Sequence, residues 1–233
     1  MKSVLIQAGY QYDPEKKVWQ RGSSDGDGSG DESTHRIACL IDEAGDVTTS
    51  SVELFALSDD EAILYHLSPL RANLLRPVAE MFSGRVLEIG AGGGAVTRFL
   101  GETGGEIVAL EPHRGWAGIA AARCRDLANV DVVVDHLHHL PFEPVFDAIV
   151  LIGALEEAGR HLPDNRVDPA EELLSRVTRL LKPDGILFVA TDNQLSLRRL
   201  AGEEGAAGVR FGRRRWRESL VQSGLTCQRW IFP

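Results

Sequence analysis

The pattern of apolar positions changes near residue 85 of the chain. From there on, short apolar runs alternate with longer segments that have the character of helices. Short continuous apolar runs are typical of strands buried on both faces, and their alternation with helices predicts a parallel sheet that is covered on both sides. We therefore expect an α/β fold with a doubly wound, mostly parallel, Rossmann-like sheet. The expected strands are 86–89, 107–110, 130–134, 146–152, 186–191 (after a turn at 182–185) and 225–232, and the expected helices are 95–100, 115–128, 169–181 and 213–223.

The first sixty residues have a weaker pattern. Two apolar stretches, Val4–Ile6 and Val18-Trp19, flank Asp13-Pro14 and predict a small hairpin or an extended arm. The polar, glycine-rich segment 22–33 predicts a loop. A short helix is expected at 36–43, a loop at 48–51, and a mostly helical segment, broken by prolines, at 57–81. We expect residues 1–60 to form an N-terminal extension and residues 61–233 to form the main domain.

Length, charge and cysteine content narrow the class of protein. A chain of 233 residues is one large domain, or one domain with a small appendage. Its net charge of −9 disfavours non-specific binding of nucleic acid. The run Arg213–Arg217 is basic, and it indicates either a solvated helix face or a rim that binds an anionic substrate. Cys39, Cys124 and Cys227 are scattered and odd in number, which argues against a disulfide framework or a thiolate zinc site.

The chain has no apolar run near the ~20 residues of a membrane span. Its start has too few consecutive apolar residues for a secretory signal, so we expect a cytoplasmic protein.

The strongest motif is the glycine-rich turn after the strand 86–89. Glycines allow a tight turn and a close approach of the backbone to a ligand. Gly90-x-Gly92-x-x-Ala95 fits the dinucleotide fingerprint, with Glu111 at the distance expected for a ribose contact. Glu88 favours a different cofactor, because a carboxylate beside a pyrophosphate is repulsive. The same carboxylate can hold the cationic amino-acid end of S-adenosylmethionine.

With this motif the sequence resembles the class I S-adenosylmethionine-dependent methyltransferases. The matching segments, in order, are 86–94, 108–112, 140–150 and 180–185. The resemblance implies that the glycine loop lines the methionine part of the cofactor, that Glu111 contacts the ribose, that 135–137 pack along the adenine, and that 152–154 lie under the sulfonium. The implied cofactor-binding residues are Tyr65, Arg71, Glu88, Gly90, Ala91, Gly92, Glu111, Pro112, Asp135, His136, Leu137, Ile152 and Gly153.

A narrower likeness concerns the segments on either side of this region. Residues 65–77 and 192–202 look like bacterial methyltransferases of surface-polysaccharide and glycan pathways, which are found beside or fused to glycosyltransferases. This implies methyl transfer to an oxygen or nitrogen of a sugar or glycoconjugate, with Asn193 and Gln194 as substrate contacts. Without the likeness, Tyr65 and Arg71 are ordinary helix residues and Asn193 and Gln194 are turn residues.

Two features depart from the family pattern. Glu157 stands where the family usually has histidine or an aromatic residue, and the chain stops at 233 after the first of two expected final strands. Either the native chain continues, or the sheet ends differently.

A hydroxyl acceptor needs a general base, most often His, Asp or Glu. The candidates are His136, His139, Glu156 and Glu157, with His138 and His161 nearby in the sequence, because they follow the third and fourth strands. The spacing His136-x-His138-His139 also suits a metal, but loop histidines are commoner on a solvated surface, and we expect no metal site. Three other functions stay open: an NAD-dependent oxidoreductase, a nucleic-acid methyltransferase and a non-catalytic module that binds the cofactor.

Overall fold

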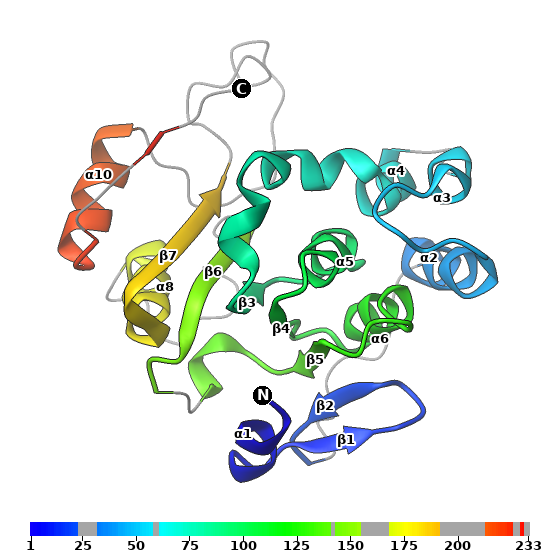
Figure 1. Cartoon of the computed structure of the whole chain (residues 1–233), viewed down its shortest axis with the longest axis horizontal. Helices are drawn as coiled ribbons and strands as arrows, with labels where there is room; N and C mark the ends of the chain where they lie inside the picture. Colours follow the sequence, from blue (N-terminus) through cyan, green and yellow to red (C-terminus); the bar gives the residue numbers. More distant parts are fainter. Residues whose placement is uncertain are drawn as a thin grey trace.

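In the part of the chain that the structure describes, seven strands form one sheet (Figure 1). The computed structural model describes residues 1–22, 32–57, 61–140, 143–154, 168–191, 213–225 and 229–230. The strand order is β1-β2-β5-β4-β3-β6-β7, and every neighbouring pair is parallel except the antiparallel pair of β1 and β2. The strands are β1 (Gln11–Asp13), β2 (Val18–Gln20), β3 (Arg85–Ile89), β4 (Glu106–Leu110), β5 (Val130–Val134), β6 (Phe146–Ile152) and β7 (Leu181–Ala190). The predicted α/β, mostly parallel sheet is confirmed.

Among the described residues, three helices cover one face of the sheet. They are α1 (Lys2–Gln7), α8 (Pro169–Leu180) and α10 (Arg213–Gln222). Their buried residues, among them Leu5, Leu174 and Trp216, join one core cluster with inward-facing residues of the sheet. Pro169 is preorganised for the first turn of α8, and the side chain of Asp168 caps that helix by accepting from the N–H of Ala170 at 2.9 Å.

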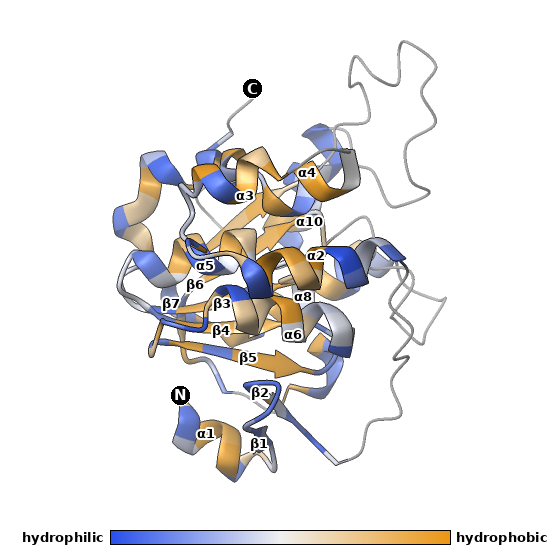
Figure 2. Ribbon diagram, turned by 90° about the vertical axis from the view of Figure 1, so that its right-hand side faces the viewer, coloured by the Kyte–Doolittle hydropathy of each residue, from blue (hydrophilic) through white to orange (hydrophobic). Residues whose placement is uncertain are grey.

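The other face is covered in two layers. The inner layer contains α5 (Ala95–Glu102), α6 (Arg114–Arg123) and the 3₁₀ helices η1 (Pro69–Leu74) and η2 (Arg76–Phe82). The outer layer contains α2 (Glu32–Glu43), α3 (Val52–Ala56) and α4 (Glu61–Leu67), whose buried residues pack around Ile119 of α6. Figure 2 shows strands β3 to β7 as largely apolar behind the helices of this face. The sheet is therefore doubly wound, as predicted.

The first twenty residues differ from the sequence-based prediction. Val4–Ile6 belong to a helix, so their assignment to a hairpin or arm is wrong, and Leu5 is fully buried against the sheet. Gly9, with φ +84°, ends that helix in the left-handed region. The hairpin instead joins Gln11–Asp13 to Val18–Gln20, and β2 extends the main sheet by pairing with β5.

Smaller differences concern the ends of elements. The segment expected to be helical over 57–81 divides into α4, η1 and η2, because Pro69 and Pro77 begin new turns. Helix α6 ends at Arg123 rather than near 128. The expected turn at 182–185 is a bulge inside β7: Phe146 pairs with Leu181, and the next pairing is Ala148 with Ile186. The predicted strand 225–232 and the predicted loop 22–33 lie mostly outside the described residues.

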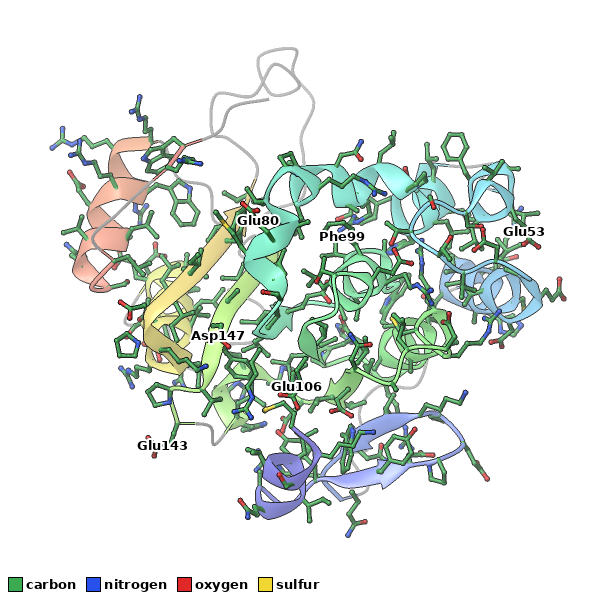
Figure 3. All side chains as sticks on the ribbon, viewed as in Figure 1. Glu53, Glu80, Phe99, Glu106, Glu143 and Asp147 are labelled. Atoms are coloured by element: carbon green, nitrogen blue, oxygen red, sulfur yellow. The ribbon has the colours of Figure 1, made fainter. Side chains whose placement is uncertain are left out.

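Charged side chains gather at the amino ends of the central strands. The Arg85 Nε lies 2.8 Å from Glu106, and the Lys182 Nζ lies 2.6 Å from Asp147, which also accepts from the N–H of Arg85. Glu106 and Asp147 are labelled in Figure 3. These ion pairs lie at the opposite end of the strands from the residues predicted to bind ligand, so we assign them to the fold and not to the site.

Candidate functional site

The predicted site residues follow four neighbouring strands. The glycine loop follows β3, Glu111-Pro112 follow β4, Asp135–Leu137 follow β5, and Ile152-Gly153 end β6 and begin the next loop. These strands are consecutive in the sheet, in the order β5-β4-β3-β6, and parallel. Their carboxyl ends therefore lie along one edge, where open α/β sheets bind ligands.

The glycine loop has a backbone that depends on glycine. Gly90, Gly92 and Gly94 have φ of +82°, +50° and +76°, in the region that other residues rarely adopt. The N–H groups of Gly90 and Ala91 both donate to the carbonyl oxygen of Leu110 at the end of β4. A Cβ on Gly94 would lie 2.7 Å from the Cα of Ala120, so this glycine also allows α5 and α6 to pack closely. These contacts fix the loop between the end of β4 and the start of α5, with Gly90 exposed and Gly92 half-buried.

Glu88 is a buried acid beneath this loop. Its residue exposure is 3%, and its Oε2 has no hydrogen-bond partner among the residues that the structure describes. Burial raises the pKa of Glu88 to about 8, although the Thr97 hydroxyl and the charge of Arg71 lower it in part. An unsatisfied buried carboxyl is costly unless a partner completes it. The cationic amino-acid end of a cofactor fits this group, whereas a pyrophosphate does not.

Glu111 connects the end of β4 to the glycine loop. Its Oε2 accepts from the N–H of Gly92 at 2.9 Å, and its Oε1 accepts from the N–H of His113 at 3.0 Å. The side chain is buried, so these two bonds fix the carboxylate beside the loop. Pro112, the next residue, is half-buried at the same edge.

Helix α4 and the turn after it lie over the glycine loop. The hydroxyl of Tyr65 is 3.7 Å from the position that a Cβ on Gly153 would take, and the Arg71 guanidinium lies 4.0 Å from the centre of the Tyr65 ring. Tyr65 and Arg71 are therefore brought to the same edge as the loops after β3 and β6. Because Tyr65 is 55% exposed, it can contact both a ligand and solvent.

His66, the neighbour of Tyr65, also lies at this site, although the sequence pattern did not indicate it. Its ring stacks on Trp116 with a centroid distance of 4.2 Å, and its Cβ lies 3.2 Å from the position of a Cβ on Gly93. The buried Arg123 donates to the carbonyl oxygens of His66 and Leu67 and so fixes the end of α4 over the loop. Only the position of His66 beside Tyr65 in the sequence could have indicated this role.

The loop after β5 is organised around Asp135. Its Oδ2 accepts from the Tyr10 hydroxyl at 2.6 Å, and its Oδ1 accepts from the N–H of His136 at 2.7 Å and lies 2.8 Å from Nδ1 of His139. Burial opposes the ionisation of Asp135, but these hydrogen bonds outweigh it and hold the pKa of the carboxyl below its ordinary value. Leu137 begins the short 3₁₀ helix η3 (Leu137–His139) and packs against the core.

Two of the candidate general bases, His136 and His139, lie together in the loop after β5, with ring centroids 6.0 Å apart. His136 and His139 follow β5, which is three strand positions from β6, or about 14 Å at the usual strand spacing. Glu156, Glu157 and His161, like the predicted substrate residues Asn193 and Gln194, lie outside the described residues. Within the described ranges, no three His, Cys, Asp or Glu side chains are placed to hold a metal ion. None of the helices described there has the length and apolar character to cross a membrane.

Two of the arginines of α10 form ion pairs with acidic side chains. Arg215 pairs with Asp168, and Arg214 pairs with Glu218 along the same helix at 3.0 Å. These pairs favour the solvated helix face over a rim that binds anions.

The structure thus combines a mostly parallel sheet, a Glu-x-Gly-x-Gly-x-Gly turn after β3 and a buried acid, Glu111, directly after β4. Residues 87–189 match the family described as a methyltransferase domain. This part of the chain is therefore similar to methyltransferase domains.

The relatives are similar over part of their length. An uncharacterized methyltransferase of Staphylococcus carnosus is 32% identical over 118 residues, which are 51% of this chain and 52% of that protein. A ubiquinone biosynthesis O-methyltransferase of Pseudomonas aeruginosa is 30% identical over 139 residues, which are 56% of this chain and 54% of that protein. The chain thus spans about half the length of the curated relatives it matches.

Solved structures share the fold. The YcgJ protein of Bacillus subtilis has a TM-score of 0.50 at 21% identity, covering 65% of this chain and 66% of its own. Phosphoethanolamine N-methyltransferase 2 of Haemonchus contortus, solved with phosphomonomethylethanolamine and S-adenosylhomocysteine, has a TM-score of 0.51 at 18% identity, covering 73% of this chain and 43% of its own.

Proposed function

We propose that this protein transfers a methyl group from S-adenosylmethionine to an oxygen or nitrogen of a small molecule. The observation that carries the proposal is the buried Glu88, whose Oε2 has no hydrogen-bond partner within the described segments of the chain. In the proposed complex Glu88 holds the ammonium of the cofactor, the glycine loop accommodates its methionine part, and Glu111 accepts from the ribose hydroxyls. Tyr65 and Arg71 form the wall of the pocket, and Ile152-Gly153 support the sulfonium.

The chemistry needs little covalent participation by the protein. Methyl transfer is an in-line displacement at an activated carbon, so alignment and exclusion of water supply most of the acceleration. A hydroxyl acceptor also needs a base close to the methyl group. We assign that role to the segment after β6, which holds Glu156 and Glu157, because His136 and His139 follow a strand about 14 Å away.

The proposal also concerns the identity of the molecule that receives the methyl group. The sequence resemblance of 65–77 and 192–202 supports a sugar or glycoconjugate, with Asn193 and Gln194 as contacts and a glycosyltransferase as a fused or associated partner. The relatives named for ubiquinone biosynthesis support an oxygen acceptor without indicating a sugar. We propose further that the protein acts in the cytoplasm and that residues 61–233 form the catalytic unit, with 1–60 as an extension.

The proposal is tested by calorimetric titration with S-adenosylhomocysteine and, separately, with NAD. Micromolar binding of the first and none of the second is expected, and the reverse result would establish a dinucleotide enzyme. Transfer of a labelled methyl group is then assayed on sugar nucleotides, glycans, hydroxylated aromatic rings, amines and RNA. Methylation of RNA alone would overturn the small-molecule acceptor, and binding without transfer to any of them would favour a non-catalytic module.

A further inference from the structure

The N-terminal hairpin brings two side chains to the loop after β5. Gln20 of β2 pairs with Val134 of β5 in parallel register, so the residues that follow them, Arg21 and Asp135, emerge side by side. Gln11 pairs with Gln20 across the hairpin, which places Tyr10 next to Arg21. The strand pairing itself therefore carries Tyr10 and Arg21 to Asp135, although Tyr10 and Asp135 are 125 residues apart in the sequence.

These three side chains form a closed network. The Tyr10 hydroxyl donates to Asp135 Oδ2, and Arg21 Nη2 donates to the Tyr10 oxygen at 3.0 Å and lies 3.4 Å from the same carboxylate oxygen. The Arg21 guanidinium also lies 4.5 Å from the centre of the Tyr10 ring and donates to the carbonyl oxygen of His139. Burial and the neighbouring Asp135 raise the pKa of Tyr10, so its hydroxyl remains a donor. Both ends of the loop 135–139 are thus tied to the hairpin.

The network determines what the loop can offer to a ligand. The two oxygens of Asp135 already receive hydrogen bonds from Tyr10, His136 and His139, in addition to the charge of Arg21. An ionised carboxylate only accepts, so the Nδ1 of a neutral His139 carries the proton and its Nε2 becomes an acceptor. The His139 side chain is 54% exposed, and its ring lies against that of His138 with a centroid distance of 3.9 Å.

The order of the strands indicates which part of a bound ligand lies near Nε2 of His139. Glu88 ends β3, Glu111 follows β4, and His139 follows β5, and the three strands are consecutive. A nucleoside whose amino-acid end is at Glu88 and whose ribose is at Glu111 places its base beyond β4, over the loop after β5. The edge of adenine presents an amino group, which is a donor that matches Nε2.

We propose that Tyr10 and Arg21 are positioning residues of the cofactor site, and that they act through Asp135 to hold His139 so that its Nε2 accepts a hydrogen bond from the adenine amino group. The inference rests on the proposed function. It assigns part of the recognition of the cofactor to residues outside the segment 87–189 that matches the methyltransferase domain.

Contacts other than the Tyr10 hydroxyl also hold the hairpin on the sheet, so this hydroxyl can be removed without detaching the hairpin. Trp19 Nε1 donates to Asp131 at 2.9 Å, and the pairing of β2 with β5 does not involve the Tyr10 hydroxyl. The variant Tyr10→Phe therefore removes one hydroxyl and leaves the hairpin in place. Tyr12→Phe is the matched control, because Tyr12 lies on the same hairpin with 48% exposure.

The experiment titrates the full chain with S-adenosylhomocysteine and with S-inosylhomocysteine, in which a ring carbonyl replaces the adenine amino group. The wild type is expected to prefer the adenine compound by about tenfold, since the loss of one hydrogen bond has that size of effect. Tyr10→Phe is expected to weaken binding of the adenine compound several-fold and to reduce the preference. His139→Ala, at an exposed side chain, is expected to abolish the preference even if Tyr10→Phe folds poorly. Tyr12→Phe is expected to match the wild type.

The outcomes separate the inference from the function on which it rests. Equal affinities and equal preferences for Tyr10→Phe and Tyr12→Phe, or a preference that survives His139→Ala, would overturn the inference while the cofactor assignment stands. If the wild type binds neither compound, the proposed function fails and the inference falls with it.

Discussion

The carboxylate of Glu111 accepts a hydrogen bond of 2.9 Å from the backbone N–H of Gly92, across the gap between β4 and the glycine loop. Its second oxygen accepts from His113. One buried side chain therefore sets the distance between the two loops that are proposed to hold the ribose and the methionine part of the cofactor.

The first prediction concerns this carboxylate. Glu111→Gln turns an NH₂ group toward one of the two backbone donors, so one hydrogen bond is lost and a donor is left unpaired. We expect a loss of about 1–3 kcal/mol in the free energy of unfolding and a tenfold or greater loss in affinity for S-adenosylhomocysteine. Urea unfolding and calorimetry measure the two effects. The control is Glu143→Gln, at an exposed carboxylate labelled in Figure 3, which should change neither quantity.

The second prediction concerns proton release on binding. With a pKa of about 8, Glu88 is mostly protonated at pH 7 in the ligand-free protein. A cofactor ammonium beside it favours the ionised form and lowers the pKa, so binding should release close to one proton. Titrations in buffers with different enthalpies of ionisation measure this number. Glu88→Gln should release none by this route and should bind more than tenfold more weakly.

The third prediction concerns stability and pH. The pKa of Glu88 is raised from 4.5 to about 8 in the folded protein, so the folded state holds this proton more tightly than the unfolded state. Its contribution to stability is complete below pH 4.5 and is lost as the pH rises to 8. The free energy of unfolding should therefore fall more steeply between pH 5.5 and 8 for the wild type than for Glu88→Gln. Parallel slopes for the two proteins would contradict the raised pKa.

The fourth prediction compares two glycines with similar backbone angles. Gly94 and Gly104 have φ of +76° and +89°, but a Cβ on Gly94 would lie 2.7 Å from Ala120, whereas a Cβ on Gly104 meets nothing within 4 Å. Gly104→Ala should cost about 1 kcal/mol from backbone strain alone. Gly94→Ala should cost about 3 kcal/mol, because overpacking between α5 and α6 is added to the strain. Thermal unfolding of the two variants separates packing from strain, and equal losses would show that the helices move apart freely.

The sequence predicts the central sheet well because its strands are predominantly apolar and are bounded by polar or glycine-rich segments. Val130–Val134 and Phe146–Ile152 begin and end where expected. Val4–Ile6 are ambiguous, since three apolar residues fit a helix turn as well as a strand. The real edge strand, Gln11–Asp13, is polar and carries no such signal.

Within the candidate site, too, the residues with a local sequence signal could be predicted and those without one could not. Glu88 and Glu111 are found from their spacing to the glycines within one strand-loop unit. The contact between Tyr10 and Asp135 depends on a strand register between segments more than a hundred residues apart, and no local pattern encodes it. His66 likewise reaches Gly93 only through the packing of α4 on the loop.

The hairpin also closes an edge of the sheet. Without β2, strand β5 would present Val-Asp-Val-Val-Val with unpaired backbone groups, and an apolar, proline-free edge of this kind is a template for association with other chains. β1, which takes the outer position instead, is three residues long and largely exposed and polar. The hairpin precedes β5 by more than a hundred residues in the chain, so it is already made when β5 emerges and is available to pair with that edge.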